Sequence, residues 1–240
     1  NLKDTNLAIN EISRWPNYNP TKLFSLKNLA NNLGFKNIYY KDESTRFGLG
    51  SFKALGGAYA VLKYLQKSLI ETNKKNINTD DIRLGKFHSQ TKKLTVSTAT
   101  DGNHGRSVAY GAQLFGCKCR IYVHKKVSLG RRKAMEDLGA SIIEVDGNYD
   151  ESVKFCINES KKSNWQIISD TSYPGYTEYP RQIMAGYTVL AHEINKQLSY
   201  QSPTHIFLQA GVGGFAAAIS SYFWQKYGHK NIRFIIVEPE

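Results

Sequence analysis

The chain has 240 residues and a formal net charge of +12, from 32 lysines and arginines against 20 aspartates and glutamates. Hydrophobic residues make up 41% of it, and no segment approaches the roughly 20 consecutive apolar residues of a spanning helix, so we expect no membrane segment. This apolar content is enough for a folded core, which excludes a disordered tail, and the length predicts one large or two small domains.

The first predicted elements precede residue 94. The segment 37–43 (NIYYKDE) is typical of a strand, and 52–70 is typical of a helix. The following segment, 71–93, is rich in Asn, Lys and other polar residues, so we expect a solvated loop or insertion there.

From residue 94 onward, short apolar runs alternate with helical segments. The runs predict strands over 94–98, 119–123, 141–145, 165–169, 205–209 and 233–238. The intervening segments predict helices over 103–115, 128–138, 150–162, 180–198 and 213–227. Continuous apolar strands separated by helices indicate parallel sheets covered on both faces, so we predict an α/β fold with doubly wound, mainly parallel sheets.

The sequence stops at the end of its last predicted strand. A parallel strand is normally followed by a crossover helix, and none follows Glu240. We therefore expect a longer protein whose C-terminal part is missing here.

A loop bearing glycines, 44–52, leads into a predicted helix whose first turn holds Lys53. Lysine is the side chain that forms a Schiff base with an aldehyde cofactor, and partial burial at a helix start helps to keep its amine neutral. The alternative is an ordinary surface lysine. Its apolar neighbours, Phe52 and Ala54, favour a partly buried position and therefore the catalytic interpretation.

A second loop, Asp101-Gly102-Asn103-His104-Gly105, follows the strand predicted over 94–98. Asp and Asn can cap the next helix, and the two glycines also indicate that the backbone approaches a ligand closely. His104 is a possible base, but we expect it to pack or to hydrogen-bond locally.

Two further loops follow predicted strands. Gly211-Val212-Gly213-Gly214 precedes a helix of small residues, a pattern that presents backbone N–H groups to a phosphate. With Ala216 and Glu238 it also satisfies the outline of a dinucleotide fingerprint, so a nicotinamide-dependent dehydrogenase is an alternative. Asp170 follows the strand predicted over 165–169, where it forms a turn or serves as a second acid beside Asp101.

The cysteines and the basic residues indicate no further site. Three cysteines are too few for a disulfide scaffold, so we expect free thiols, no metal site and a reducing, cytoplasmic setting. The positive charge invites a nucleic-acid interpretation. We expect no nucleic-acid partner, because the basic residues are scattered and no recognition motif is present.

Four segments in this order resemble the fold-type II pyridoxal-phosphate enzymes, and within them the diaminopropionate ammonia-lyases. They are KDESTRFGLGSFKALGGAYA, TATDGNHGRSVAYGA, SDTSYPGYTEYPRQIMAGY and PTHIFLQAGVGGFAAA. The resemblance covers about residues 39–238. It implies a two-domain enzyme, and we expect a large cofactor-binding domain from 1–89 and 173–240 and a small α/β domain from 90–172.

The resemblance also implies a role for each loop. Lys53 is expected to hold pyridoxal 5'-phosphate as a Schiff base and Asn103 to hydrogen-bond its phenolic oxygen. The backbone of Gly211, Val212, Gly213 and Gly214 is expected to bind the phosphate. Asp101 stands where most relatives have Ser or Thr, and such a carboxylate is thought to act as base for one substrate enantiomer, with Lys53 serving the other. Asp170 stands where the family has a second acid.

The implied activity is elimination of 2,3-diaminopropionate, an amino acid substrate, to pyruvate and ammonia by a cytoplasmic homodimer. An acidic pocket suits a substrate with a second ammonium group. The alternatives are a serine or threonine dehydratase-like lyase and a truncated, inactive homologue, because the expected C-terminal part would supply the group that faces the pyridine nitrogen.

Overall fold

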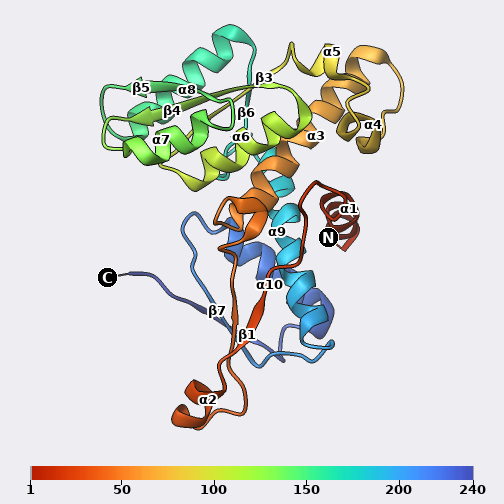
Figure 1. Cartoon of the computed structure of the whole chain (residues 1–240), viewed down its shortest axis with the longest axis vertical. Helices are drawn as coiled ribbons and strands as arrows, with labels where there is room; N and C mark the ends of the chain where they lie inside the picture. The colour runs from red at the N-terminus through yellow and green to blue at the C-terminus, as the bar shows by residue number, and fades with distance from the viewer. Residues whose placement is uncertain (1, 240) are drawn as a thin grey trace.

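The fold is that of a computed structural model, which describes residues 2–239. A four-stranded sheet forms one end of the elongated molecule (Figure 1). Its strands pair only in parallel, in the order β5-β4-β3-β6. They are β3 (Thr95–Ala99), β4 (Lys118–His124), β5 (Ser141–Val145) and β6 (Gln166–Ile167). Nearly all of β3 is buried, as expected for a central strand covered on both faces.

The helices between these strands cover both faces of the sheet. Helices α6 (Asn103–Phe115) and α7 (Leu129–Glu136) join β3, β4 and β5 in turn, and α8 (Tyr149–Ser163) leads back to β6 on the other side of β3. The direction of winding therefore reverses between β3 and β6. In an open parallel sheet, ligands bind beyond the carboxyl ends of the strands at such a reversal.

Two long helices connect this sheet to the rest of the molecule. Helix α3 (Lys53–Asn73) packs on α6 on one side and on α9 (Glu178–Gln197) on the other (Figure 1). Glycines allow both approaches: a Cβ atom at Gly186 of α9 would lie 2.4 Å from the carbonyl oxygen of Leu55, and one at Gly111 of α6 would lie 2.6 Å from the Cα of Ala58. Helix α3 is thus buried on two sides.

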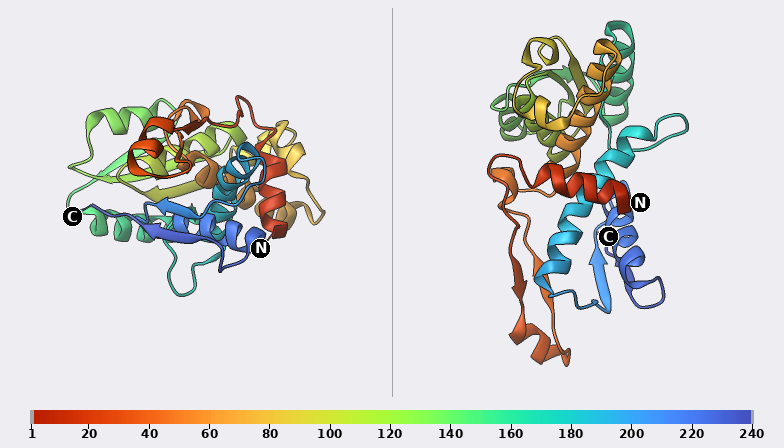
Figure 2. Two further views of the ribbon diagram at one scale, coloured as in Figure 1. Left: turned by 90° about the horizontal axis from the view of Figure 1, so that it is seen from below. Right: turned by 90° about the vertical axis from the view of Figure 1, so that its right-hand side faces the viewer.

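The other end of the molecule is built from shorter elements. Helix α1 (Leu2–Ile12) packs on α9. Strand β7 (His205–Leu208) pairs in parallel with β8 (Arg233–Ile236), and α10 (Gly214–Tyr227) joins the two. Strands β1 (Leu23–Ser25) and β2 (Tyr39–Lys41), with α2 (Lys27–Leu33) between them, form an arm that points away from the four-stranded sheet (Figure 2).

The α/β fold with mainly parallel sheets is confirmed, and two local expectations need correction. The predicted strand at 37–43 pairs antiparallel with β1, a strand that the sequence analysis did not assign. The polar segment 71–93 is not all loop: α3 continues to Asn73, and α4 (Thr79–Arg83) and α5 (His88–Thr91) follow. Asn78 begins α4 by accepting a hydrogen bond from the Asp80 N–H. Across residues 2–239, no helix is both long enough and apolar enough to cross a membrane.

Candidate active site

Lys53 is the first residue of α3, and its amine contacts a carboxylate from a distant loop. The Ser51 hydroxyl accepts a hydrogen bond from the Lys53 backbone N–H at 3.2 Å. The Lys53 Nζ atom lies 2.5 Å from Oδ2 of Asp170, which follows β6. The side chains of Lys53 and Asp170 are 28% and 12% exposed, so the ion pair is largely shielded from solvent and still open on one side. The structure thus brings together two predicted site residues that are far apart in sequence.

Asp170 is held as a carboxylate by its surroundings. Burial would raise the pKa of this carboxyl, but the charges of His104 and Lys53 and the hydrogen bond from Lys53 lower it below its ordinary value. The Nδ1 atom of His104 lies 3.7 Å from Asp170 Oδ2. Asp170 is therefore ionised at neutral pH and able to attract a cationic group.

His104 takes a larger part in the site than the sequence analysis expected. Its Nε2 atom donates a hydrogen bond of 2.8 Å to the carbonyl oxygen of Ile168, at the end of β6, so the ring contact is not local. The other ring nitrogen, Nδ1, is the one near Asp170. Nδ1 has no hydrogen-bond partner among the described residues. His104 thus bridges the two loops at the reversal of winding.

Asp101 and Asn103 lie at the carboxyl end of β3, apart from the Lys53–Asp170 pair. Oδ1 of Asp101 accepts a hydrogen bond of 2.9 Å from His124 Nε2, and its side chain is 55% exposed. Asn103, the first residue of α6, is also exposed. Both carboxylates influence Tyr149, which the sequence analysis missed: burial and then the charges of Asp170 and Asp101 raise the pKa of its hydroxyl.

The glycine loop before α10 has the backbone geometry of an anion cradle. Gly211 and Gly213 have φ values of 54° and 84°, in the left-handed region that favours glycine. The N–H groups of a helix's first turn have no partner within the helix, so the start of α10 at Gly214 offers such donors. Val212 is 55% exposed, so the loop is open to solvent. These features fit a phosphate group.

Aromatic packing places the glycine loop beside Lys53. The rings of Phe52, which precedes Lys53, and Phe215, which follows Gly214, have centroids 4.2 Å apart. A Cβ atom at Gly214 would lie 3.8 Å from the backbone oxygen of Asp170. The amine, the carboxylate and the N–H cradle therefore converge, and the set fits a cofactor that carries both an aldehyde and a phosphate.

A buried ionic network anchors the loop that leads to Lys53, and the sequence analysis missed it. Arg46 is 1% exposed, and its guanidinium binds Glu193 of α9 at 2.7 Å and Glu43 at 2.8 Å. Lys41 Nζ also binds Glu193, at 2.7 Å. The three-residue spacing of Glu43 and Arg46 is visible in the sequence, but their partner on α9 is not. The network fixes the loop to α9 and so positions the start of α3.

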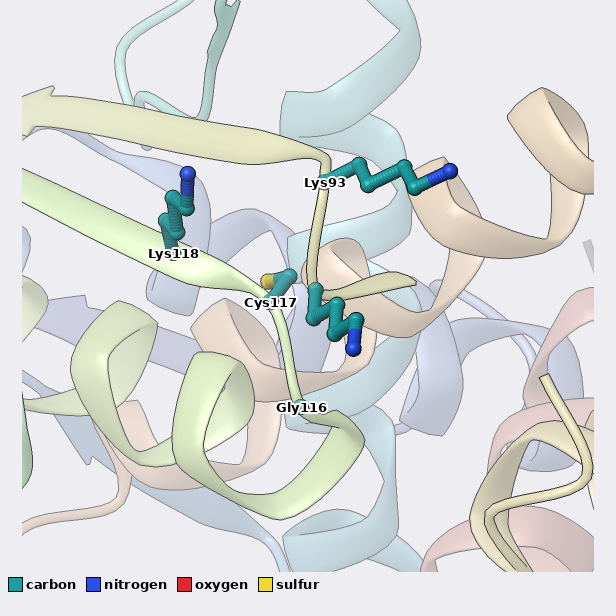
Figure 3. Close-up of a pocket in the computed structure, with 5 residues that line it drawn as sticks. Lys93, Gly116, Cys117 and Lys118 are labelled. Carbon is teal, nitrogen blue, oxygen red and sulfur yellow. The ribbon is translucent and has the colours of Figure 1, made fainter. Parts of the chain in front are cut away.

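An open hollow on the four-stranded sheet, away from this site, is lined by residues of other types. It lies at the amino ends of β3 and β4 and is lined by Lys92, Lys93, Gly116, Cys117 and Lys118. Figure 3 shows Lys93 and Lys118 pointing in different directions from their separate strand ends. Burial raises the pKa of the Cys117 thiol to about 12, so it remains protonated at neutral pH. The hollow therefore offers neither converging charges nor a nucleophile.

Comparisons with known proteins agree with this chemistry. The family model described as "Pyridoxal-phosphate dependent enzyme" matches residues 14–240, which favours that cofactor over the nicotinamide alternative. The diaminopropionate ammonia-lyase of Escherichia coli strain K12 is 40% identical over 226 residues, covering 93% of this chain and 55% of that protein. The chain thus spans about half the length of the curated relative.

Solved structures show the same similarity. The apo form of Escherichia coli diaminopropionate ammonia lyase has a TM-score of 0.91 at 39% identity, covering 99% of this chain and 64% of that one. The same enzyme in complex with an aminoacrylate-PLP azomethine reaction intermediate has a TM-score of 0.88 at 39% identity, with 99% and 59% covered. The fold is therefore that of fold-type II enzymes.

Proposed function

Because the chain belongs to the family of pyridoxal-phosphate dependent enzymes, we propose that it eliminates ammonia from 2,3-diaminopropionate to give pyruvate and a second ammonia. The observation that carries this proposal is the 2.5 Å contact between Lys53 and Asp170 beside the glycine cradle. This contact places an amine that can bind an aldehyde cofactor next to a carboxylate that can bind a cationic substrate. The 40% identity to a diaminopropionate ammonia-lyase supports this substrate over serine or threonine.

We propose that three elements hold the cofactor. Lys53 would bind its aldehyde, the backbone of Gly211, Val212, Gly213 and Gly214 its phosphate, and Asn103 its phenolic oxygen. In the structure the Gly213 N–H donates to the Ala210 carbonyl at 2.9 Å, so the other N–H groups of this loop are the ones open to the phosphate. When bound, pyridoxal phosphate supplies an electron sink for the carbanion that forms at Cα. The exposure of Asn103 and of the glycine loop supports this assignment, because both remain open to a ligand.

Asp170 and Asp101 would contact different groups of the substrate. We propose that Asp170, ionised and largely buried, attracts an ammonium group of the substrate. Asp101 and Lys53 would remove the Cα proton from opposite enantiomers. The hydrogen bond from His124 supports a fixed orientation of the Asp101 carboxyl, as a general base requires.

We also propose a homodimer in a reducing, cytoplasmic compartment, with no nucleic-acid partner. The free thiols of Cys117, Cys119 and Cys156 support the compartment. Exposed apolar side chains on the arm of β1, α2 and β2, such as Leu33 and Phe35, support self-association.

The test uses the purified chain with pyridoxal phosphate. We expect a visible absorption band that borohydride bleaches and that Lys53→Ala abolishes, because the amine is then absent. Lys67→Ala is the matched control, since Lys67 lies on the same helix in an exposed pair with Glu178. Pyruvate release should be faster from 2,3-diaminopropionate than from serine. Equal rates on both would refute the proposed substrate, and a band that survives Lys53→Ala would refute the proposed lysine.

A further inference from the structure

Tyr187 of α9 carries a buried hydroxyl that nothing in the described chain satisfies. The residue is 2% exposed, and its oxygen has no hydrogen-bond partner among residues 2–239. Its ring packs edge-on against Phe52 at 5.1 Å and against Phe215 at 6.1 Å. A phenylalanine would make the same ring contacts without burying an unpaired donor, which costs free energy. The hydroxyl is therefore not explained by packing.

The position of the ring places this hydroxyl at the site. A Cβ atom at Gly56 would lie 2.5 Å from Tyr187 Cε1, so only a glycine admits the ring at this point of α3, one turn after Lys53. Phe52 and Phe215, which flank the ring, adjoin Lys53 and the glycine cradle respectively. Burial and then the charge of Asp170 hold the pKa of Tyr187 well above its ordinary value, so the hydroxyl keeps its proton and acts as a donor.

The Asp170 carboxylate has few hydrogen-bond donors around it once the Lys53 amine moves away. In the structure its Oδ2 atom is held by Lys53 Nζ, and its own backbone N–H also stabilises the carboxylate. His104 does not replace the lysine in this geometry, because its Nε2–H is donated to Ile168 and its Nδ1 lies 3.7 Å from Asp170 Oδ2, beyond hydrogen-bond distance. A lysine nitrogen bound to an aldehyde has at most one N–H, where the free ammonium has three, so it has less to donate to Asp170. The buried Tyr187 phenol is then a side-chain donor that has no partner among the described residues and that feels the charge of this carboxylate.

We propose that Tyr187 is a positioning residue for Asp170, whose hydroxyl donates a hydrogen bond to the carboxylate when Lys53 Nζ releases it. The exchange keeps Asp170 charged and oriented toward the substrate's ammonium group. The proposal rests on the proposed function only in that Lys53 must leave Asp170 to hold an aldehyde. The exchange itself is a property of the chain and can be tested without cofactor.

The test is a double-mutant cycle on unfolding by urea, with Lys53→Met standing for withdrawal of the ammonium group. In the wild-type background we expect Tyr187→Phe to leave the unfolding midpoint unchanged or to raise it, because an unpaired hydroxyl is removed. In the Lys53→Met background the same change should raise the unfolding equilibrium constant about tenfold, because a hydrogen bond to a carboxylate is lost. Adding Asp170→Ala to the Lys53→Met background should remove that effect, because no side-chain acceptor is then left at this position.

Tyr179→Phe is the control, since Tyr179 is buried on the same helix and packs on Tyr64 and Tyr176 instead. It should have the same effect in both backgrounds. An equal effect of Tyr187→Phe in both backgrounds would overturn the proposal. Lys53→Leu, which also has no hydrogen-bond donor, replaces Lys53→Met if the latter does not fold. Absence of a pyridoxal-phosphate band in the wild type would refute the proposed function and leave the result of the cycle intact.

Discussion

At the scale of single residues, the charge of Asp170 depends on its neighbours Lys53 and His104. A carboxyl with a depressed pKa in the folded state stabilises the fold above its unfolded pKa, and this stabilisation is lost as the pH falls through the folded pKa. Lys53 and His104 therefore couple the stability of the chain to pH in the acid range.

Asp170→Asn should remove this dependence. We expect the wild type to be more stable than the variant at neutral pH and the difference to disappear as the pH falls below the ordinary carboxyl value of 3.8. Urea unfolding between pH 7 and pH 2.5 measures it. Asp146→Asn is the control, because Asp146 is 87% exposed in its pair with Lys125. A difference that is constant over the whole range would show that Asp170 acts through packing alone.

The buried network around Glu193 makes a stronger prediction. Burial would raise the pKa of Glu193, but Arg46 and Lys41 lower it below its ordinary value, so the group is ionised with both partners in place. Glu193→Gln leaves the buried Lys41 without a carboxylate partner and Arg46 with Glu43 alone, which should cost roughly 3–5 kcal/mol. Glu178→Gln, in the exposed pair with Lys67, should cost about 0–1 kcal/mol. Similar losses of unfolding free energy in the two variants would show that the buried network stabilises the fold no more than an exposed ion pair does.

At the scale of elements, α3 and α9 can cross this closely because glycines, which have no side chain, lie at their contact. We expect Gly186→Ala to destabilise the chain by about 1–3 kcal/mol, because the new methyl group meets the Leu55 carbonyl and neither backbone can move freely. Gly130→Ala in α7 is the matched control: its Cβ would meet nothing within 4 Å, so it should stabilise by about 0.5–1 kcal/mol. Chemical denaturation compares the two, and a neutral Gly186→Ala would show that the helices separate easily.

The elements that the sequence predicted are those with local apolar patterns. The strands of the four-stranded sheet and their crossover helices differ from the expected ranges by only a few residues, because continuous apolar runs and capping residues are local signals. β1 was not predicted, since a three-residue strand is defined by its partner and not by its own composition. Helices α4 and α5 were missed because both lie in a polar segment.

The candidate site was predictable where glycines and charges occur in loops at strand ends. Such loops, or the first helical residue after them, contain all the predicted site residues: Lys53, Asp101, Asn103, Asp170 and the glycine loop. Tyr187 and Glu193 belong to an ordinary amphipathic helix, and only the packing of α9 against α3 and the Lys53 loop brings them to the site. No local pattern carries that information.

At the scale of the whole molecule, the arm exposes an unusual number of large apolar side chains. They are Phe24, Leu29, Leu33, Phe35, Tyr39 and Tyr40. Grouped apolar surface of this kind favours association, so we expect the apparent mass to rise with concentration. Leu33→Glu combined with Phe35→Glu should shift the protein toward the monomer in size-exclusion chromatography with light scattering. Leu84→Glu, equally exposed but off the arm, should not. A monomer at every concentration would contradict the expectation.

Helix α3 is shared between the two ends of the molecule, packing on α6 toward the four-stranded sheet and on α9 toward the other end. Lys53 is the first residue of this helix, so its position is set by both packings at once. Any change in how α3 crosses α6 or α9 would therefore change the distance of the Lys53 amine from Asp170 and from the glycine loop.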